Sequence, residues 1–401
     1  MKNGIDDLAV LGGAKLFATP RSTSSLVPPD PARVKAYLAP LFDAADGEGA
    51  IVANLERRFA LFHDAADCIA MANGFWSLVL AIKALALPGR SEIVMPSLTY
   101  RRLADVAAWA GLKPRFCDVD QSTLAVSPAT MEPCLGPDAA LIMAVHPIVG
   151  VCDAAGLAAL AHHRQLPILF DAVESVYETL PQGRVGRFGN GEVFSFHASK
   201  LLNGFEGGYV TTSDADLARR LRSARDHGRS TTGATTGAMT TNARLSALHA
   251  ATALAALDGL SEQIVHNRDI YNAWCRHLAD IPGIRVVPFD TTWRTSFKNI
   301  LVELDPATWP LTRDMTVRIL NAEGALARAY YAPPLHRKPM AYSHVPADLP
   351  LTDALASRFL LMPCGHFVSV EDVAMLGHLM RLLARGGSAL RERLSAAGCT
   401  A

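Results

Sequence analysis

The chain has 401 residues, and its 38 lysine and arginine residues balance its 38 aspartate and glutamate residues, so it lacks the positive footprint typical of nucleic-acid-binding proteins. Half of the residues are hydrophobic, but no apolar stretch reaches the roughly 18 residues that a membrane helix needs, and Asp6, Asp7 and Lys15 interrupt the segment where a secretory signal would lie. The seven cysteines are scattered and never spaced as CxxC, which favours reduced thiols over a disulfide framework or a zinc site. We therefore expect a cytoplasmic protein without nucleic-acid or membrane partners.

Between about residues 66 and 212, short apolar runs alternate with helix-like segments. The runs are too continuously apolar for half-exposed strands, so the pattern predicts a mostly parallel sheet covered by helices on both faces. Such sheets bind ligands outside the carboxyl ends of their strands, which makes the polar residues after each run candidates for a site. The expected strands are Cys68–Ala72, Glu92–Met95, Pro114–Asp118, Ala139–Val145, Pro167–Asp171 and Val193–Phe196, and the expected helices are Trp76–Leu87, Arg101–Ala110, Ala154–His163 and Asp214–Asp226.

The rest of the chain predicts a mobile loop, a long helix and a smaller α+β unit. Residues 229–242 are rich in threonine, glycine and alanine, and this low complexity is typical of a loop. A helical stretch from about Arg244 to Ala279 is long enough to bridge two domains. We expect an N-terminal arm at 1–25, a large α/β domain at 26–245, and an interdomain helix with a small C-terminal domain at 246–401. That last domain should hold strands at Arg285–Val287 and Asn299–Glu303 and helices at Leu311–Glu323 and Val370–Ala384, the second capped by Ser369 with Asp372.

Lys200 and Asp171 each stand at the end of a buried run. Lys200 follows Phe-Ser-Phe-His-Ala-Ser and precedes a glycine-rich turn, and it is one of only eight lysines. A lysine buried there can lose its proton and act as the nucleophilic amine of a Schiff base, although a surface lysine on a turn has the same pattern. Asp171, as a buried acid, needs a cationic partner such as a protonated pyridine nitrogen, and the alternative is a helix N-cap.

Two further strand ends carry candidate binding residues. Asn73 and Gly74 lie between a strand and a helix, where exposed amides can bind a phosphate, although glycine is common at such turns. Tyr100 follows Met-Pro-Ser-Leu-Thr, where its ring can stack on a flat cofactor or simply pack in the core. Each of these signals is weak when taken alone.

Together, and in this order, these motifs resemble those of the fold-type-I, pyridoxal-phosphate-dependent sugar aminotransferases of the DegT/StrS family. The resemblance spans roughly residues 50–380. It implies an α/β fold with a mostly parallel sheet sandwiched by helices in a large domain, plus a small C-terminal α+β domain. The matching segments are 72–74, 93–100, 116–120, 145–150, 171–175, 194–200, 206–208, 225–228, 242–246 and 330–336.

The resemblance assigns roles to three residues around the cofactor ring. Lys200 would form the Schiff base with pyridoxal 5'-phosphate and would carry a proton between the substrate carbon and the cofactor. Asp171 would pair with the pyridinium nitrogen and hold it protonated, so that the ring acts as an electron sink. Glu174 would contact the ring hydroxyl.

The resemblance also assigns the ring face and the phosphate. Tyr100 would stack on the ring, and Ser195 would bind the phosphate together with Asn73, Gly74 and the amide of Phe75. Asn242 matches a residue that reaches the phosphate from the neighbouring subunit, so the resemblance implies a homodimer with shared active sites. No role follows for His146, which has the pattern of a satisfied core histidine, or for His197.

The sequence departs from the family pattern at three places. Phe75, followed by Trp76, replaces the usual threonine whose hydroxyl and amide hold the phosphate. Backbone amides can still serve there, but two bulky aromatic side chains are expected to reshape the pocket. Ala247 replaces an acid, and Pro-Ile-Val at 147–149 replaces an aromatic segment.

Because Lys200 is retained where the dehydratase branch has a histidine, the resemblance favours amino transfer. Glutamate or glutamine would donate the amino group, and the acceptor would be a keto sugar, foremost a nucleotide-linked 4-keto-6-deoxyhexose. The alternatives are an enzyme of the same fold that acts on a non-nucleotide keto substrate, a dehydratase, and a non-catalytic cofactor-binding regulator.

Overall fold

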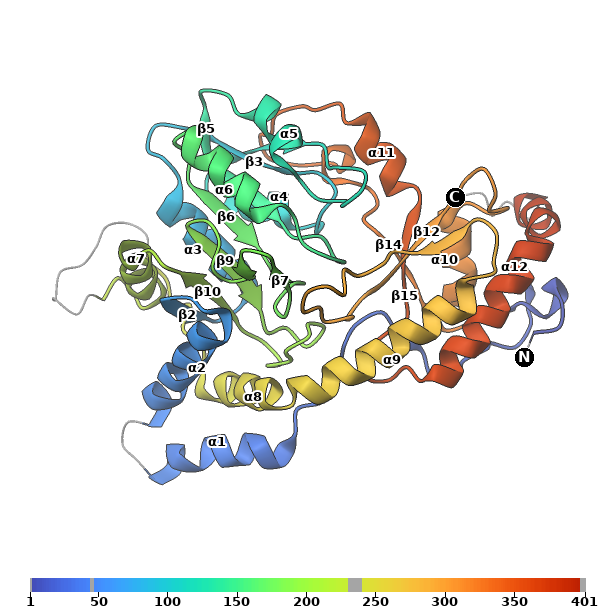
Figure 1. The fold of residues 1–401 in the computed structure, drawn as a ribbon, viewed down its shortest axis with the longest axis horizontal. Coiled ribbons are helices and arrows are strands. Elements are labelled where there is room, and N and C mark those ends of the chain that lie inside the picture. Colours follow the sequence, from blue (N-terminus) through green and yellow to red (C-terminus); the bar gives the residue numbers. More distant parts are fainter. Residues whose placement is uncertain (1, 44–46, 230–239, 397–401) are drawn as a thin grey trace.

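The computed structural model describes residues 2–43, 47–229 and 240–396 and builds them around two β-sheets (Figure 1). The larger sheet lies among the blue, cyan and green elements, and the smaller one among the orange elements. Two helices, α8 (Ala247–Asp258) and α9 (Leu260–Leu278), lead from the first sheet to the second. The predicted loop at 229–242 falls mostly outside the described residues.

Seven strands form the larger sheet, in the order β2-β10-β9-β6-β5-β3-β4. Six of them run parallel to one another and confirm the six predicted strands to within two residues at each end. The seventh, β10, runs antiparallel between β2 and β9, and the apolar pattern misses it because half of its Tyr-Val-Thr-Thr run is polar. The strands are β2 (Asp67–Met71), β3 (Glu92–Pro96), β4 (Lys113–Cys117), β5 (Ala139–Val145), β6 (Ile168–Asp171), β9 (Gly191–Ser195) and β10 (Gly208–Thr212).

Helices cover both faces of this sheet, as the continuous apolar runs require. One face packs on α3, α4 and α7, and the other on α5 and α6 together with α2 and α8. The four helices predicted in this region are confirmed to within two residues at each end. The bounds are α1 (Pro31–Asp43), α2 (Gly47–His63), α3 (Gly74–Leu85), α4 (Leu103–Trp109), α5 (Pro128–Met131), α6 (Ala154–His163) and α7 (Ala215–Arg225), with a small hairpin of β7 (Thr179–Leu180) and β8 (Gly183–Arg184).

The single helix predicted from about Arg244 to Ala279 is wrong in one respect, because the chain forms two helices there. Ser246 caps the first by accepting a hydrogen bond from the amide of His249. Gly259 separates them, as its low helix propensity permits. The second helix, α9, packs along the C-terminal helix α12 (Val370–Ala396) (Figure 1).

The smaller sheet has four antiparallel strands in the order β11-β12-β15-β14. The two strands and the helix predicted before residue 324 are present, each shifted by one or two residues at an end. The four-residue apolar run of β15 is too short for its period to distinguish a strand from a helix, so sequence pattern alone does not reveal it. The elements are β11 (Ile284–Val286), β12 (Ile300–Leu304), β13 (Ala325–Leu326), β14 (Arg328–Ala329), β15 (Phe359–Met362), α10 (Arg313–Ala322) and α11 (Pro350–Ala356).

Helix α12 continues twelve residues beyond the predicted end at Ala384, through a glycine pair that usually weakens a helix. Close packing explains the pair, because a Cβ on Gly386 would lie 2.6 Å from Ile5 and one on Gly387 would lie 2.5 Å from Pro310. The predicted N-terminal cap is confirmed. The amide of Ser369 donates to Asp372 Oδ2 at 3.0 Å, and the amide of Asp372 donates to Ser369 Oγ at 3.1 Å.

The N-terminal segment packs against the smaller sheet. Its strand β1 (Arg21–Ser22) pairs in parallel with β13, and the buried Lys2 forms an ion pair with Glu323 at 3.0 Å. The division of the chain at residues 25 and 245 stays a prediction. Within the described ranges, no helix combines the length and the apolar character that crossing a membrane would require.

Candidate active site

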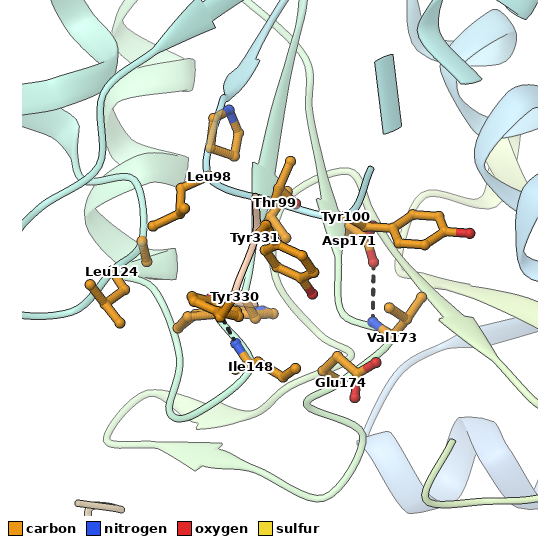
Figure 2. A pocket seen from close by; sticks show the side chains of 15 residues that line it. Leu98, Thr99, Tyr100, Leu124, Ile148, Asp171, Val173, Glu174, Tyr330 and Tyr331 are labelled. Carbon is orange, nitrogen blue, oxygen red and sulfur yellow. Dashed lines mark hydrogen bonds between the residues drawn. The ribbon is translucent and has the colours of Figure 1, made fainter. Parts of the chain in front are cut away.

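A pocket opens at the carboxyl ends of β3, β5 and β6, where the sheet topology predicts a ligand site (Figure 2). Most of its wall comes from the segments that follow these strands. A fourth side comes from the chain just after β14, which belongs to the smaller sheet. The lining residues are Pro96, Leu98, Thr99, Tyr100, Leu124, Ala125, Val145, His146, Pro147, Ile148, Asp171, Val173, Glu174, Tyr330 and Tyr331.

Asp171 ends β6 inside this pocket and is only 2% exposed. Its Oδ1 accepts a hydrogen bond from the amide of Val173 at 3.2 Å, so the carboxylate holds a turn and does not cap a helix (Figure 2). Burial raises the pKa of Asp171 to about 6, although the Val173 amide and the nearby Lys200 ammonium oppose the rise. A buried carboxylate that accepts so few hydrogen bonds is suited to bind a cationic group of a ligand.

Lys200 reaches the same place from the turn after β9. Its Nζ lies 2.5 Å from Glu174 Oε1. Burial lowers the pKa of Lys200, but Glu174 outweighs burial, so the pKa lies above its ordinary value in this ion pair. The structure thus brings together the three residues expected around the cofactor ring, Lys200, Asp171 and Glu174.

A second lysine, Lys298, also binds Glu174, and sequence analysis misses it. Its Nζ forms an ion pair with Glu174 Oε2, and the side chain is only 4% exposed. Asn299 Nδ2 donates to the same oxygen at 3.3 Å. Burial alone would raise the pKa of Glu174, but the ammonium groups of Lys200 and Lys298 hold it well below its ordinary value. The sequence feature that could have indicated Lys298 is that it is one of only eight lysines and lies just before the apolar strand β12.

The start of α3 forms a cradle of backbone amides. Asn73 Oδ1 accepts a hydrogen bond from the amide of Trp76 at 2.9 Å and so caps the helix. The amides of Gly74 and Phe75 lie ahead of the intrahelical hydrogen bonds and can bind an anion. Space is tight, because a Cβ on Gly74 would lie 3.2 Å from the Cβ of Ser195. The expected phosphate residues Asn73, Gly74, Phe75 and Ser195 are therefore neighbours.

Tyr100 lines the pocket and is 46% exposed, so it is not the core tyrosine of the alternative interpretation. Next to it, Thr99 Oγ1 is buried and has no hydrogen-bond partner among the described residues. Tyr331, whose ring packs on Tyr330 with centroids 4.5 Å apart, turns its hydroxyl into the space beside Asp171 and Glu174 (Figure 2). Tyr331 belongs to a segment that the sequence links to the family without giving it a role.

Two other residues lie apart from the ring site or have structural partners. Asn242 is exposed and pairs with Asp226 in an antiparallel bridge outside the pocket, so its reach to a neighbouring subunit stays a prediction. His146 is buried, lies parallel to Phe170 and contacts Cys152 and Glu192 at 3.3 and 3.4 Å. It has the contacts of a satisfied core histidine, although it also borders the pocket.

The aromatic pair that departs from the family pattern does not fill the ring site. Phe75 and Trp76 both pack edge-on against Trp109, the last residue of α4, with ring centroids 6.2 and 6.3 Å apart. Trp109 is 65% exposed. The pair therefore forms an aromatic cluster beside the amide cradle.

These residues fit pyridoxal phosphate. The buried carboxylate of Asp171 suits a protonated ring nitrogen, the amine of Lys200 suits a Schiff base, and the amides at the start of α3 suit the phosphate. The unpartnered Thr99 hydroxyl shows that the pocket offers a polar contact that no described side chain uses. No group of three or more histidine, cysteine, aspartate or glutamate side chains in the described residues could hold a metal ion.

Comparison with known proteins gives the same assignment. The structure of DesI determined in the presence of its TDP-sugar product superposes with a TM-score of 0.90 at 33% identity, covering 97% of this chain and 99% of DesI. GDP-perosamine synthase of Caulobacter vibrioides is 29% identical over 329 residues, which are 81% of this chain and 88% of the relative. L-glutamine:2-deoxy-scyllo-inosose aminotransferase of Micromonospora echinospora is 34% identical over 225 residues, 52% of this chain and 54% of the relative.

The model of the DegT/DnrJ/EryC1/StrS aminotransferase family matches residues 43–381, which include both sheets and every residue of the ring site. Fold, cofactor chemistry and sequence likeness agree over nearly the whole chain. The chain belongs to the DegT/DnrJ/EryC1/StrS aminotransferase family and is a pyridoxal-phosphate-dependent aminotransferase.

Proposed function

We propose that this enzyme transfers an amino group from glutamate or glutamine to a keto sugar, foremost a nucleotide-linked 4-keto-6-deoxyhexose. The observation that carries the proposal is the placement of Lys200 against Glu174 in the pocket that ends with Asp171. The sugar class is supported by relatives that match most of the chain, DesI with its TDP-sugar product and GDP-perosamine synthase. We also propose that the enzyme works in the cytoplasm as a homodimer in which Asn242 completes the partner's phosphate site.

Each residue of the site has a task that follows from its position. Pyridoxal phosphate, when bound, supplies an electron sink that stabilises negative charge at the substrate carbon. Asp171 keeps its negative charge beside the ring nitrogen, and the amides of Gly74 and Phe75 fix the phosphate. Lys200 Nζ takes the proton from the substrate carbon and returns one later, which requires it to be neutral when it acts as a base.

A second candidate acceptor is a keto substrate without a nucleotide. The aromatic cluster of Phe75, Trp76 and Trp109 beside the cradle favours this acceptor, because the cluster presents partly exposed apolar rings close to the site. The glutamine-dependent relative from Micromonospora is named for such an acceptor, 2-deoxy-scyllo-inosose. The two half-reactions of amino transfer can be measured one at a time, and the second one distinguishes the two candidate acceptors.

The first half-reaction tests the donor and the catalytic lysine. Borohydride should fix pyridoxal phosphate on Lys200, and glutamate or glutamine should convert the bound cofactor to its amine form with stoichiometric release of the keto acid. Lys200→Ala should lose both the covalent label and the turnover. A wild-type protein that binds the cofactor but releases no keto acid from any amino donor would contradict amino transfer and favour a dehydratase.

The second half-reaction tests the acceptor. The amine form of the enzyme is mixed with a TDP-linked 4-keto-6-deoxyhexose or with 2-deoxy-scyllo-inosose, and the return of the aldehyde form is followed by absorbance. We expect the nucleotide sugar to react faster. If 2-deoxy-scyllo-inosose reacts and the nucleotide sugar does not, the acceptor is the second candidate, a keto substrate without a nucleotide.

A further inference from the structure

Two ammonium groups share the carboxylate of Glu174, one on each oxygen. Lys200 pairs with Oε1 at 2.5 Å, whereas Lys298 pairs with Oε2, which Asn299 also contacts. Glu174 lines the pocket, and the Lys298 side chain behind it is almost completely buried. The two ammonium groups therefore share one carboxylate, and Asp171 is the other carboxylate whose charge acts on Lys200.

The two ammonium groups repel each other across Glu174, and this repulsion disappears when one of them loses its charge. Lys298 cannot leave easily, because it is held by Glu174 and its side chain is only 4% exposed. Lys200 lies on a turn, and its side chain is 19% exposed. Of the two lysines, Lys200 is therefore the one placed to leave the ion pair with Glu174.

Lys298 also matters once Lys200 has bonded the cofactor. The ammonium of Lys200 then no longer faces Glu174 Oε1 as a free cation. Lys298 and Asn299 remain on Oε2 and hold the buried carboxylate ionised and in place. Without Lys298, Glu174 would depend on the cofactor alone for a counter-charge.

We propose that Lys298 is a positioning residue that balances and holds Glu174 from the side opposite Lys200, so that Lys200 can leave the ion pair, bond the cofactor and later act as a neutral base. This inference rests on the proposed role of Lys200. It assigns Lys298 no contact with the reacting atoms.

Other titratable groups face this cluster from the neighbouring elements: Asp171, His146, Tyr100, Tyr330–Tyr331, Cys364 and Arg328. Burial raises the pKa of the Tyr330 phenol above its ordinary value and that of the Cys364 thiol to about 11, so these two are neutral near pH 7. None of the groups is removed when Lys298 is replaced. Their effect is therefore the same in the wild type and in the variants.

The test is an absorbance titration of the holoenzyme, which reports the pH at which the Schiff base on Lys200 loses its proton. Lys298→Met removes a positive charge near the protonated Schiff base, so this pH should rise by about one to two units, whereas Lys298→Arg should leave it near the wild-type value. Lys298→Gln serves as a second neutral variant if the methionine variant does not fold. The matched control is Lys2→Met, because Lys2 is an equally buried lysine whose partner, Glu323, lies away from the site.

The pH profile of the first half-reaction should move with the titration, because Lys200 must lose its proton to act as a base. A neutral variant that titrates at the wild-type pH, or an arginine variant that shifts as far as the methionine variant, would overturn the inference. Borohydride labelling of Lys200 in the same samples separates the two proposals. Failure to label the wild type would refute the role of Lys200 itself, whereas normal labelling with an unchanged titration would refute only the role of Lys298.

Discussion

Replacement of Asp171 by asparagine should stabilise the cofactor-free protein while it disables the enzyme. Burial raises the pKa of this carboxyl to about 6, from 3.8 in the unfolded chain. Because the pKa is higher in the folded protein than in the unfolded chain, this carboxyl group favours the folded state most below pH 3.8. That contribution to the free energy of unfolding is lost as the pH rises through about 6. Each pH unit between the two values corresponds to about 1.36 kcal/mol, so above pH 7 the ionised carboxylate costs the folded protein about 3 kcal/mol.

Asparagine keeps the shape and the hydrogen bond from Val173 but carries no charge, so it avoids this cost. A chain of 401 residues has an unfolding entropy on the order of 0.8 kcal/mol/K. The expected gain for Asp171→Asn at pH 8 is therefore roughly 3–4 °C in the unfolding midpoint. The gain should shrink as the pH falls through 6 and vanish near pH 4.

The assay is thermal unfolding of the cofactor-free wild type and variant between pH 4 and pH 8. Asp120→Asn is the control, because the Ser122 hydroxyl and amide lower the pKa of Asp120 and its replacement should destabilise the protein at pH 7. Equal midpoints for the wild type and Asp171→Asn at pH 8 would refute the reasoning, as would a pH-independent gap. In the loaded enzyme, loss of the charge that would pair with the ring nitrogen should slow amino transfer about 10³-fold, while borohydride still fixes the cofactor on Lys200.

Two further predictions concern the amide cradle and the core of the smaller unit. Asn73→Ala removes the cap of α3, so it should cost about 1 kcal/mol and weaken cofactor binding several-fold in an absorbance titration. Asp214→Ala at the cap of α7 should cost similar stability with unchanged affinity, and equal affinity losses in both would contradict a role for the cradle. Trp274→Ala should cost about 3–5 kcal/mol in urea unfolding, since its fully buried ring leaves a cavity and its Nε1 no longer donates to the Pro363 carbonyl at 3.0 Å. Trp293, which is 39% exposed, is the control, and its alanine variant should change stability by less than about 0.5 kcal/mol.

The larger sheet is predictable because its strands are buried on both faces. A strand of that kind is a continuous apolar run, and the polar residue at its end marks the edge where ligands bind. Asp171 and Lys200 are found by that rule, and in the structure Asp171 lines the pocket while Lys200 pairs with Glu174 of the same pocket. Strand β10 is not found by this rule, because its short apolar pair Tyr-Val is followed by two polar threonines.

The part of the site that comes from the smaller sheet could not be predicted in the same way. Lys298 lies 124 positions after Glu174, and Tyr331 lies further still. The spacing of apolar residues along the chain does not indicate that the loop before β12 contacts the turn after β6. That contact depends on how the two sheets pack, which is set by many apolar contacts along the intervening helices and by no short motif.

The departure at Phe75 shows why a missing side chain need not mean a missing function. The usual threonine would contribute a hydroxyl, but the cradle here rests on the helix start itself, on the Asn73 cap and on the tight approach of Gly74 to Ser195. Backbone amides do not depend on the side chain that they carry, so a phosphate site can survive the change. The freed position instead carries a ring that packs with Trp76 and the exposed Trp109. The ring cluster therefore lies beside the cradle, where we expect the acceptor substrate to bind.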